Sequence, residues 1–327
     1  MEKRKVIIDC DPGIDDALAI MLACRCEELD ILGLTIVSGN ITGIQCAENA
    51  LQILKIMGRL DIPVYLGETK PLKRENITAE ETHGNDGLGG VHFEKLSGIT
   101  YKMRGIDFLV NTLKTEKNIS ILAIGPLTNI ASLIKKDKQA ASNIKELVLM
   151  GGAFKSHGNC SPVAEFNFWA DPDAAEIVLN DLKRPITMVG LDVTRKVVLT
   201  PNYIELLHQL HNPIADFIVN ITRFYTDFHW KQERTLGCVI NDPLAIAYFI
   251  NPELCDGTDY YVDVITEGKA IGMSVVDCGG ITEKPTNCHV LTNVKAKEFM
   301  ILLMIRLFPE HKKDILTILN DPKYSYE

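Results

Sequence analysis

Four aspartates within eight residues form the strongest chemical signal in this sequence. Asp9, Asp11, Asp15 and Asp16 follow a short apolar run and enclose a Pro-Gly pair. Carboxylates buried this close together would force some of their number to protonate unless a cation neutralised them. Hard divalent metals take oxygen ligands of this kind. The cluster therefore predicts a divalent metal site, and the alternative is a solvated acidic turn in which Asp15 and Asp16 favour the positive end of the next helix.

Two other uses of an aspartate-rich loop can be tested by spacing. A calcium EF-hand needs glycine at loop position 6 and glutamate at position 12. Counted from Asp9, these positions hold Ile14 and Ile20, which excludes an EF-hand. A magnesium-dependent aspartyl phosphohydrolase also begins with strand-Asp-x-Asp, and Asp9 or Asp11 would be its nucleophile. That alternative stays open, although the sequence shows neither a P-loop nor a dinucleotide-binding glycine motif.

The elements that must position this loop follow an alternating pattern. Short apolar runs predict strands at 6–8, 31–37, 64–66, 119–124, 147–150 and 186–189, and the segments 16–26, 43–57, 106–113, 128–135 and 173–179 between them are helix-like. Parallel pairing needs a crossover helix after each strand, so this alternation indicates a mainly parallel sheet with helices on both faces. Ligands bind at the carboxyl edge of such sheets, where the aspartates lie.

The last third of the chain changes character. It predicts helices at 203–211, 213–233, 243–250, 295–307 and 312–319, and strands at 260–266, 272–276 and 288–292 that would form a hairpin or meander. No Pro/Ser-rich linker or repeat divides the chain. We therefore expect an α/β fold with a single domain over residues 1–327, a mainly parallel sheet and a small antiparallel element near the C-terminus. The longest loop, 67–100, is rich in glycine around His83, and such loops are often functional.

Composition limits the partners. The 327 residues include 43 acidic and 34 basic side chains, a net charge of −9, which disfavours nucleic acid and anionic membrane surfaces. The apolar run at 6–8 is too short for a signal peptide core, and we expect a cytoplasmic protein without a membrane span. Nine cysteines without a Cys-x-x-Cys pair suggest neither a disulfide framework nor a zinc site.

The opening motif Asp9-Cys10-Asp11-Pro12-Gly13-Ile14-Asp15-Asp16-Ala17 resembles that of the nucleoside hydrolases, the inosine-uridine preferring N-ribohydrolase family. Further segments resemble the family in the same order along nearly the whole chain. They are Val37-Ser38-Gly39-Asn40, His83-Gly84-Asn85-Asp86-Gly87-Leu88-Gly89, Gly125-Pro126-Leu127-Thr128-Asn129, Met150-Gly151-Gly152, Gly158-Asn159, Ala164-Glu165-Phe166-Asn167, Ala170-Asp171-Pro172 and Asn241-Asp242-Pro243.

The resemblance implies a Ca²⁺ ion held by Asp11, Asp16, Asp242 and the backbone carbonyl of Ile124, with the ribose diol and a water completing the shell. It also implies that Asp15 is the general base that takes a proton from this water as it attacks the ribose. The residue types agree with this reading, because calcium takes six to eight oxygens from carboxylates, carbonyls and waters. By itself, Asp242 could equally be the N-cap of the helix that follows.

The resemblance further implies a set of substrate-binding residues. Asn40, Asn159, Glu165 and Asn167 would bind the ribose hydroxyls, and Phe166 would contact the base. Each asparagine alone is more typical of a turn. No cluster of basic residues surrounds the motifs, which favours a nucleoside over a nucleotide.

The sequence departs from the family pattern at the departing base. Family members typically carry a histidine directly before the last metal-binding aspartate, where this chain has Asn241. Asparagine donates a hydrogen bond but is no general acid. His83, His229 and Trp230 are alternative sources of assistance to the leaving base. Trp230 lies four residues before Arg234, a spacing that fits a pocket wall or a surface cation–π pair.

The sequence thus predicts a calcium-dependent ribonucleoside hydrolase that acts in nucleoside salvage, and the resemblance implies a homodimer or homotetramer. Two alternatives remain: the magnesium-dependent phosphohydrolase, and a nucleoside- or ribose-binding protein without turnover, which Asn241 keeps open.

Overall fold

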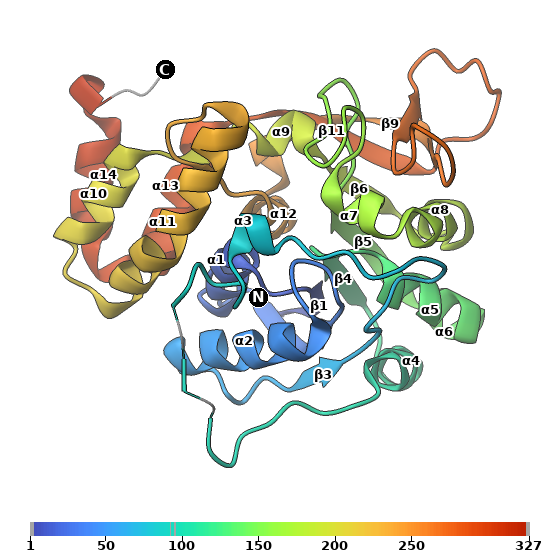
Figure 1. Cartoon of the computed structure of the whole chain (residues 1–327), viewed down its shortest axis with the longest axis horizontal. Coiled ribbons are helices and arrows are strands. Elements are labelled where there is room, and N and C mark those ends of the chain that lie inside the picture. The colour runs from blue at the N-terminus through green and yellow to red at the C-terminus, as the bar shows by residue number, and fades with distance from the viewer. Residues whose placement is uncertain (1–2, 92, 95, 325–327) are drawn as a thin grey trace.

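A nine-stranded sheet runs through the computed structural model, which describes residues 3–91, 93–94 and 96–324 (Figure 1). Its strand order is β10-β9-β11-β6-β5-β4-β1-β2-β3. The strands are β1 (Arg4–Cys10), β2 (Leu29–Ile36), β3 (Val64–Leu66), β4 (Ile119–Ala123), β5 (Ile144–Met150), β6 (Ile186–Val189), β9 (Cys255–Val264), β10 (Ser274–Asp277) and β11 (Cys288–Val294). The seven strands from β3 to β11 in this order pair in parallel, whereas β9 and β10 pair antiparallel.

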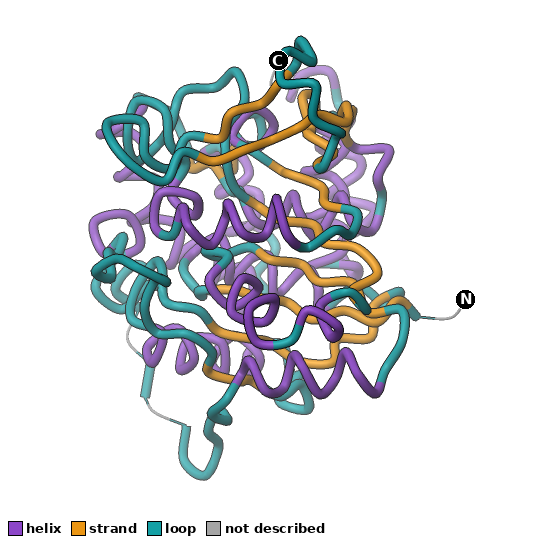
Figure 2. Tube along the Cα trace, turned by 90° about the vertical axis from the view of Figure 1, so that its right-hand side faces the viewer, coloured by secondary structure: helices purple, strands orange, loops and turns teal. Residues whose placement is uncertain are grey.

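The central strands, such as β1, β4 and β5, contribute side chains to two separate apolar cores. In β1, Val6 and Ile8 point into one core and Ile7 into the other, as the two-residue period of a strand requires. Both cores are covered by helices, so the sheet is the middle layer of the molecule (Figure 2). This double cover explains why the strands are continuously apolar instead of alternating with polar residues.

The helices divide between these two cores. One core receives α1 (Ile14–Cys24), α2 (Gly43–Ile56), α12 (Asp242–Ile250) and α13 (Ala296–Leu307), with α10 (Pro201–Gln209), α11 (Pro213–Glu233) and α14 (Lys312–Asn320) packed outside them. The other receives α4 (Gly105–Thr115), α5 (Thr128–Lys136), α6 (Lys138–Ala141) and α8 (Pro172–Asp181). No helix among the described residues is long and apolar enough to cross a bilayer.

The predicted α/β class, with its mainly parallel, helix-covered sheet and an antiparallel addition near the C-terminus, is confirmed. The predicted strands and helices are present within a few residues. The antiparallel strands extend the main sheet, because β11 pairs with β6 on one side and β9 on the other. A separate two-stranded sheet joins β7 (Val198–Leu199) to β8 (Cys238–Val239).

The order of the strands determines where the site lies. β1 is flanked by β2 on one side and by β4 on the other. The next strands after β1 are added on one side of it and the later strands, from β4 onward, on the other side. Such a switch leaves a crevice at the carboxyl ends of the two central strands. Three short helices, α3 (Glu80–His83), α7 (Phe166–Ala170) and α9 (Leu191–Thr194), lie in connections near this edge.

Candidate active site

Three buried carboxylates meet at the crevice. Asp15 and Asp16 lie in the first turn of α1, and Asp242 is the first residue of α12. Each offers a carboxylate oxygen within 4.8 Å of the other two. Segments more than two hundred residues apart in the chain therefore bring like charges together, a placement that favours a bound cation.

Asp11 follows β1 directly beside this group. Its Oδ2 accepts a hydrogen bond from the Asn40 backbone N–H (2.7 Å), whereas its Oδ1 is buried and has no hydrogen-bond partner among the described residues. Gly39 and Gly125 make room for it, because a Cβ at these positions would lie 2.1 and 2.5 Å from the two carboxylate oxygens. The unpaired, buried oxygen fits a cation ligand.

The protonation behaviour of these groups supports the same fit. Burial raises the pKa of Asp11 and of Asp242 well above the usual range, and the neighbouring aspartates add to this rise. Burial and the charge of Asp15 raise the pKa of Asp16 to about 7. A divalent cation would offset these shifts by stabilising the ionised carboxylates, and an all-oxygen donor set suits Ca²⁺ or Mg²⁺.

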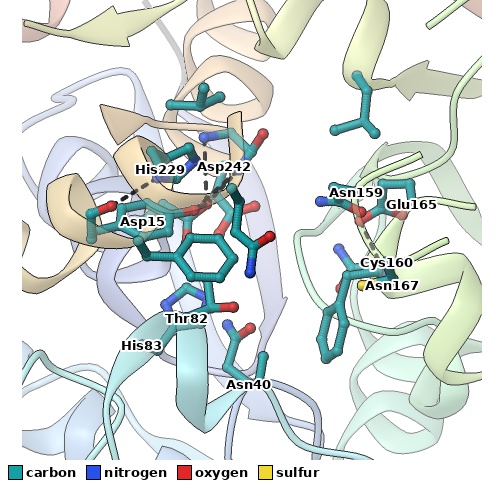
Figure 3. A pocket seen from close by; sticks show the side chains of 18 of the residues that line it. Asp15, Asn40, Thr82, His83, Asn159, Cys160, Glu165, Asn167, His229 and Asp242 are labelled. Atoms are coloured by element: carbon teal, nitrogen blue, oxygen red, sulfur yellow. Dashed lines mark hydrogen bonds between the residues drawn. The ribbon is translucent and has the colours of Figure 1, made fainter. Parts of the chain in front are cut away.

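A cavity of about 350 Å³ opens in front of the carboxylates, within the size range of small-molecule sites. Asp15, His83 and His229 lie on one side of it, and Asn159, Glu165 and Asn167 face them from the other (Figure 3). The cavity thus lies between the aspartate loop and the segment that follows β5.

Polar contacts fix the residues around the cavity floor. Asn40 Nδ2 donates to Asp16 Oδ2 (2.9 Å), and Asn167 Nδ2 donates to the carbonyl of Ile124 (3.0 Å) at the end of β4. Asn40, Ile124 and Asn167 all line the cavity. The predicted ligand carbonyl and two of the predicted ribose-binding amides are therefore brought together with the carboxylates.

Glu165 is the N-cap of α7 and lies buried in the facing wall. Its Oε1 accepts from the backbone N–H of Asn167 (2.8 Å), and its Oε2 accepts from that of Gly152 (2.9 Å). Burial raises the pKa of Glu165 to about 7. Phe166 also lines the cavity, as does Asn159 from the preceding loop. The sequence prediction had placed all three at a substrate pocket, and the structure puts them on one wall.

Asn241 and Tyr225 both bind Asp15. Asn241 Nδ2 donates to Asp15 Oδ2 at 2.9 Å, and the Tyr225 hydroxyl donates to the same oxygen at 3.2 Å. Sequence reasoning missed Tyr225. The sequence feature that could have indicated it is the four-residue spacing to His229, which places both residues on one face of α11.

The two cavity histidines have fixed tautomers. The backbone N–H of Ile14 donates to Nδ1 of His83 (3.1 Å), so the proton of the neutral ring is on Nε2. Nδ1 of His229 faces the Tyr225 carbonyl (2.9 Å) and must carry the proton there. Burial lowers the pKa of His83 to about 4 and also lowers the pKa of His229, so both rings are neutral at pH 7.

The structure corrects two earlier interpretations. Trp230 is 47% exposed and is not among the cavity-lining residues; the Arg234 guanidinium lies 5.4 Å from its ring, so the pair is a surface cation–π contact. Asp9 is fully buried, and its Oδ2 accepts from Thr35 and Asn129. It does not line the cavity and is therefore no nucleophile for a phosphoryl group.

The fold and this cavity together define an α/β enzyme with an acidic, metal-type site at the carboxyl edge of its sheet. The chain belongs to the inosine-uridine preferring nucleoside hydrolase family, whose model matches residues 6–301.

Named relatives agree with this family. The pyrimidine-specific ribonucleoside hydrolase RihA of Photobacterium profundum is 39% identical over 93% of this chain and 98% of its own length. RihB of Escherichia coli O157:H7, also called pyrimidine-specific, is 37% identical over 89% and 92%. A solved purine-preferring ribonucleoside hydrolase from Gardnerella vaginalis superposes with a TM-score of 0.88 at 30% identity, covering 94% of this chain and 99% of that one.

These matches identify the chain as a nucleoside N-ribohydrolase, an enzyme that hydrolyses the N-glycosidic bond of ribonucleosides. The predicted family and enzyme class are confirmed. The aspartyl phosphohydrolase and the binding protein without turnover are set aside.

Proposed function

We propose that this enzyme is calcium-dependent, releases ribose and a free base, and prefers pyrimidine ribonucleosides as substrates. The observation that carries the proposal is the buried group of Asp15, Asp16 and Asp242 at the floor of the cavity, beside the unpaired oxygen of Asp11. The names of the relatives at 37–39% identity support the choice of base.

Asp11, Asp16, Asp242 and the carbonyl of Ile124 are the proposed ligands of the ion. Calcium suits them because it accepts several carboxylate and carbonyl oxygens in an irregular shell. When bound, the ion would lower the pKa of a water molecule and orient the ribose diol.

Asp15 is the proposed general base, which takes a proton from the water that attacks the ribose. Its Oδ2 is already held by Asn241 and Tyr225, which keeps the carboxylate directed at the cavity. A base at this place must lie close to the ion, in agreement with the short distances between Asp15, Asp16 and Asp242.

Asn40, Asn159, Glu165 and Asn167 are the proposed ribose-binding residues, and Phe166 and His229 the proposed contacts of the base. In its ionised form, Glu165 supplies negative charge opposite the aspartates, where the sugar becomes positively charged during bond cleavage.

His83 is the proposed partner of the departing base. With Nδ1 occupied by the Ile14 N–H, its ring keeps a proton on Nε2 to donate as a hydrogen bond. Asn241 takes part in the reaction by holding Asp15 and does not act as an acid.

The remaining features of the proposal concern the setting. One continuous sheet supports a single domain over residues 1–327. We place the enzyme in the cytoplasm, in nucleoside salvage, as a homodimer or homotetramer. Light scattering on the purified protein tests the oligomer, and a monomer would contradict it.

The central experiment incubates purified protein, with and without calcium, with uridine, cytidine, inosine, adenosine and guanosine, and measures free ribose. We expect release from the pyrimidine nucleosides that EDTA abolishes and calcium restores. Asp11→Ala should lose calcium binding and ribose release together, with Asp30→Ala, an exposed strand residue, as the matched control. No release from any nucleoside in the presence of calcium would contradict the proposal.

A further inference from the structure

The two walls of the cavity come from separate segments of the chain. Tyr225 and His229 project from α11, whereas Asn159 and Glu165 belong to the loop after β5 (Figure 3). These walls lie on different elements of the chain, so a side chain that binds both would link them directly.

Arg195 is placed to do this. It caps the C-terminus of α9, lines the cavity and is only 16% exposed. One guanidinium nitrogen donates to Ser156 Oγ (2.5 Å) and to the carbonyl of His157, and the other donates to the carbonyl of Gly158 (3.0 Å). Three successive residues directly before Asn159 are therefore bound to one side chain.

The same guanidinium also reaches the opposite wall. Its second terminal nitrogen donates to Oε1 of Glu233 at 2.7 Å, and Glu233 is the last residue of α11. The planar fork of arginine allows one side chain to bind acceptors on both segments at once. Arg195 thus links the end of the helix that carries Tyr225 and His229 to the loop that carries Asn159.

A second residue of α9 holds the loop from its other end. Asp192 accepts hydrogen bonds from the backbone N–H groups of Phe154 (2.6 Å), Lys155 (2.8 Å) and Ser156 (3.0 Å). Beyond the segment, the N–H groups of Asn159 and Cys160 both bond to the carbonyl of Ala164. The loop is fixed on both sides, and among the hydrogen bonds of the described residues it is the link through Arg195 that extends to α11.

We propose that Arg195 is a positioning residue of this ribohydrolase: through Ser156–Gly158 on one side and Glu233 on the other, it sets the width of the cavity and places Asn159 for the sugar. The inference rests on the proposed role of Asn159 in substrate binding. It predicts that loss of Arg195 weakens substrate binding more than turnover, because the carboxylates at the cavity floor are untouched.

The first test is kinetic. Arg195→Ala should raise KM for a cleaved pyrimidine nucleoside on the order of 10-fold or more and change kcat by less than about 3-fold. Added guanidinium ion should lower the KM of this variant and leave the native enzyme unaffected.

Glu233→Gln keeps an acceptor oxygen and should change KM less than Glu233→Ala. Arg223→Ala, an exposed arginine on the same helix, is the matched control and should behave as the native enzyme.

The second test needs no activity. Hydrogen exchange at the amides of Gly158, Asn159 and Cys160 should become faster in Arg195→Ala and in Arg195→Lys, but remain native in Arg223→Ala. Arg195→Lys keeps the charge without the fork and serves if the alanine variant does not fold.

The outcomes separate the two proposals. A native protein that cleaves no nucleoside contradicts the proposed function, and the exchange experiment still decides whether Arg195 holds the loop. Unchanged exchange, an unchanged KM, or a loss in kcat alone would overturn the role of Arg195. So would a general loss of thermal stability without guanidinium rescue, because it would indicate a structural role only.

Discussion

The two ends of the cavity are built differently. At the metal end, Asp11 directly follows β1, Asp16 lies in the first turn of α1 and Asn40 lies in the short connection from β2 to α2, and all are at most 6% exposed. At the base end, the walls come from the loop around Ile77, which is 42% exposed, and from the last turns of α11. Regular elements fix the first end, whereas connecting segments form the second, and such segments are where related proteins vary.

This contrast also separates the chemistry that is general to the reaction from the chemistry that selects a substrate. In the proposed arrangement, the sugar, which is common to all ribonucleosides, meets the rigid end. The base, which differs between them, meets the end formed by the loop around Ile77 and the last turns of α11. The following variants test whether the two ends are independent.

Asp15→Asn should give the largest effect among them. The amide cannot take a proton, so kcat should fall about 10²- to 10⁴-fold, the usual range for loss of a general base. Calcium affinity, measured by titration calorimetry, should stay close to native because all the proposed ligands remain. Loss of calcium together with activity would show instead that Asp15 is a ligand.

Asn241→His tests the base end, and it also replaces the amide that holds Asp15 with a ring N–H. A histidine here can donate a proton to the leaving base, and kcat/KM for a poorly cleaved pyrimidine nucleoside should rise about tenfold or more. Ribose release compared over the five nucleosides measures it. An equal change in kcat/KM for every nucleoside would show that position 241 does not select the base, and would contradict the distinction between the two ends.

His83→Asn sharpens the comparison through pH. The pKa of His83 falls from 6.5 to about 4 on burial, so the unfolded chain binds a proton between these values and the folded chain does not. The contribution of His83 to the free energy of unfolding is fully present above pH 6.5 and decreases as the pH falls towards 4. At pH 5 the free energy of unfolding should be lower by about 2 kcal/mol.

Urea unfolding at pH 7 and pH 5 should therefore show a smaller acid loss in His83→Asn than in the native protein. His211→Asn, at an exposed histidine, is the control and should keep the native pH dependence. The same loss in His83→Asn as in the native chain would mean that His83 is not buried as a neutral ring.

Trp230→Ala should give the smallest effect. Its ring packs with Arg234 on the surface and does not line the cavity, so steady-state kinetics should change less than about twofold. A tenfold rise in KM would place Trp230 at the substrate and would contradict the boundary drawn here for the base end.

Sequence reasoning located the acidic cluster because a strand, a glycine turn and a helix follow one another there without interruption. Asp11, Asp16 and Asn40 come after the ends of parallel strands, and the carboxyl ends of parallel strands lie at the same edge of a sheet. The base end depends on tertiary packing. Whether Trp230 or His229 faces the cavity depends on the rotation of α11, which adjacent positions in a sequence do not determine.

The residues that were missed have a common reason. Tyr225 and Arg195 act through contacts with Asp15 and Glu233 that are tens to hundreds of residues distant, and no local motif marks them. Short elements such as α9 and β7 also lack enough residues to show a period. The alternating pattern of long elements was readable, and the short pieces that connect them were not.

The two glycines against Asp11 have a consequence for the affinity of the ion. Because the backbone of Gly39 lies against Oδ2 and that of Gly125 against Oδ1, the Asp11 carboxylate is closely packed before an ion arrives. Little ordering entropy then opposes binding, and a methyl group at either position would weaken the site without removing a single ligand.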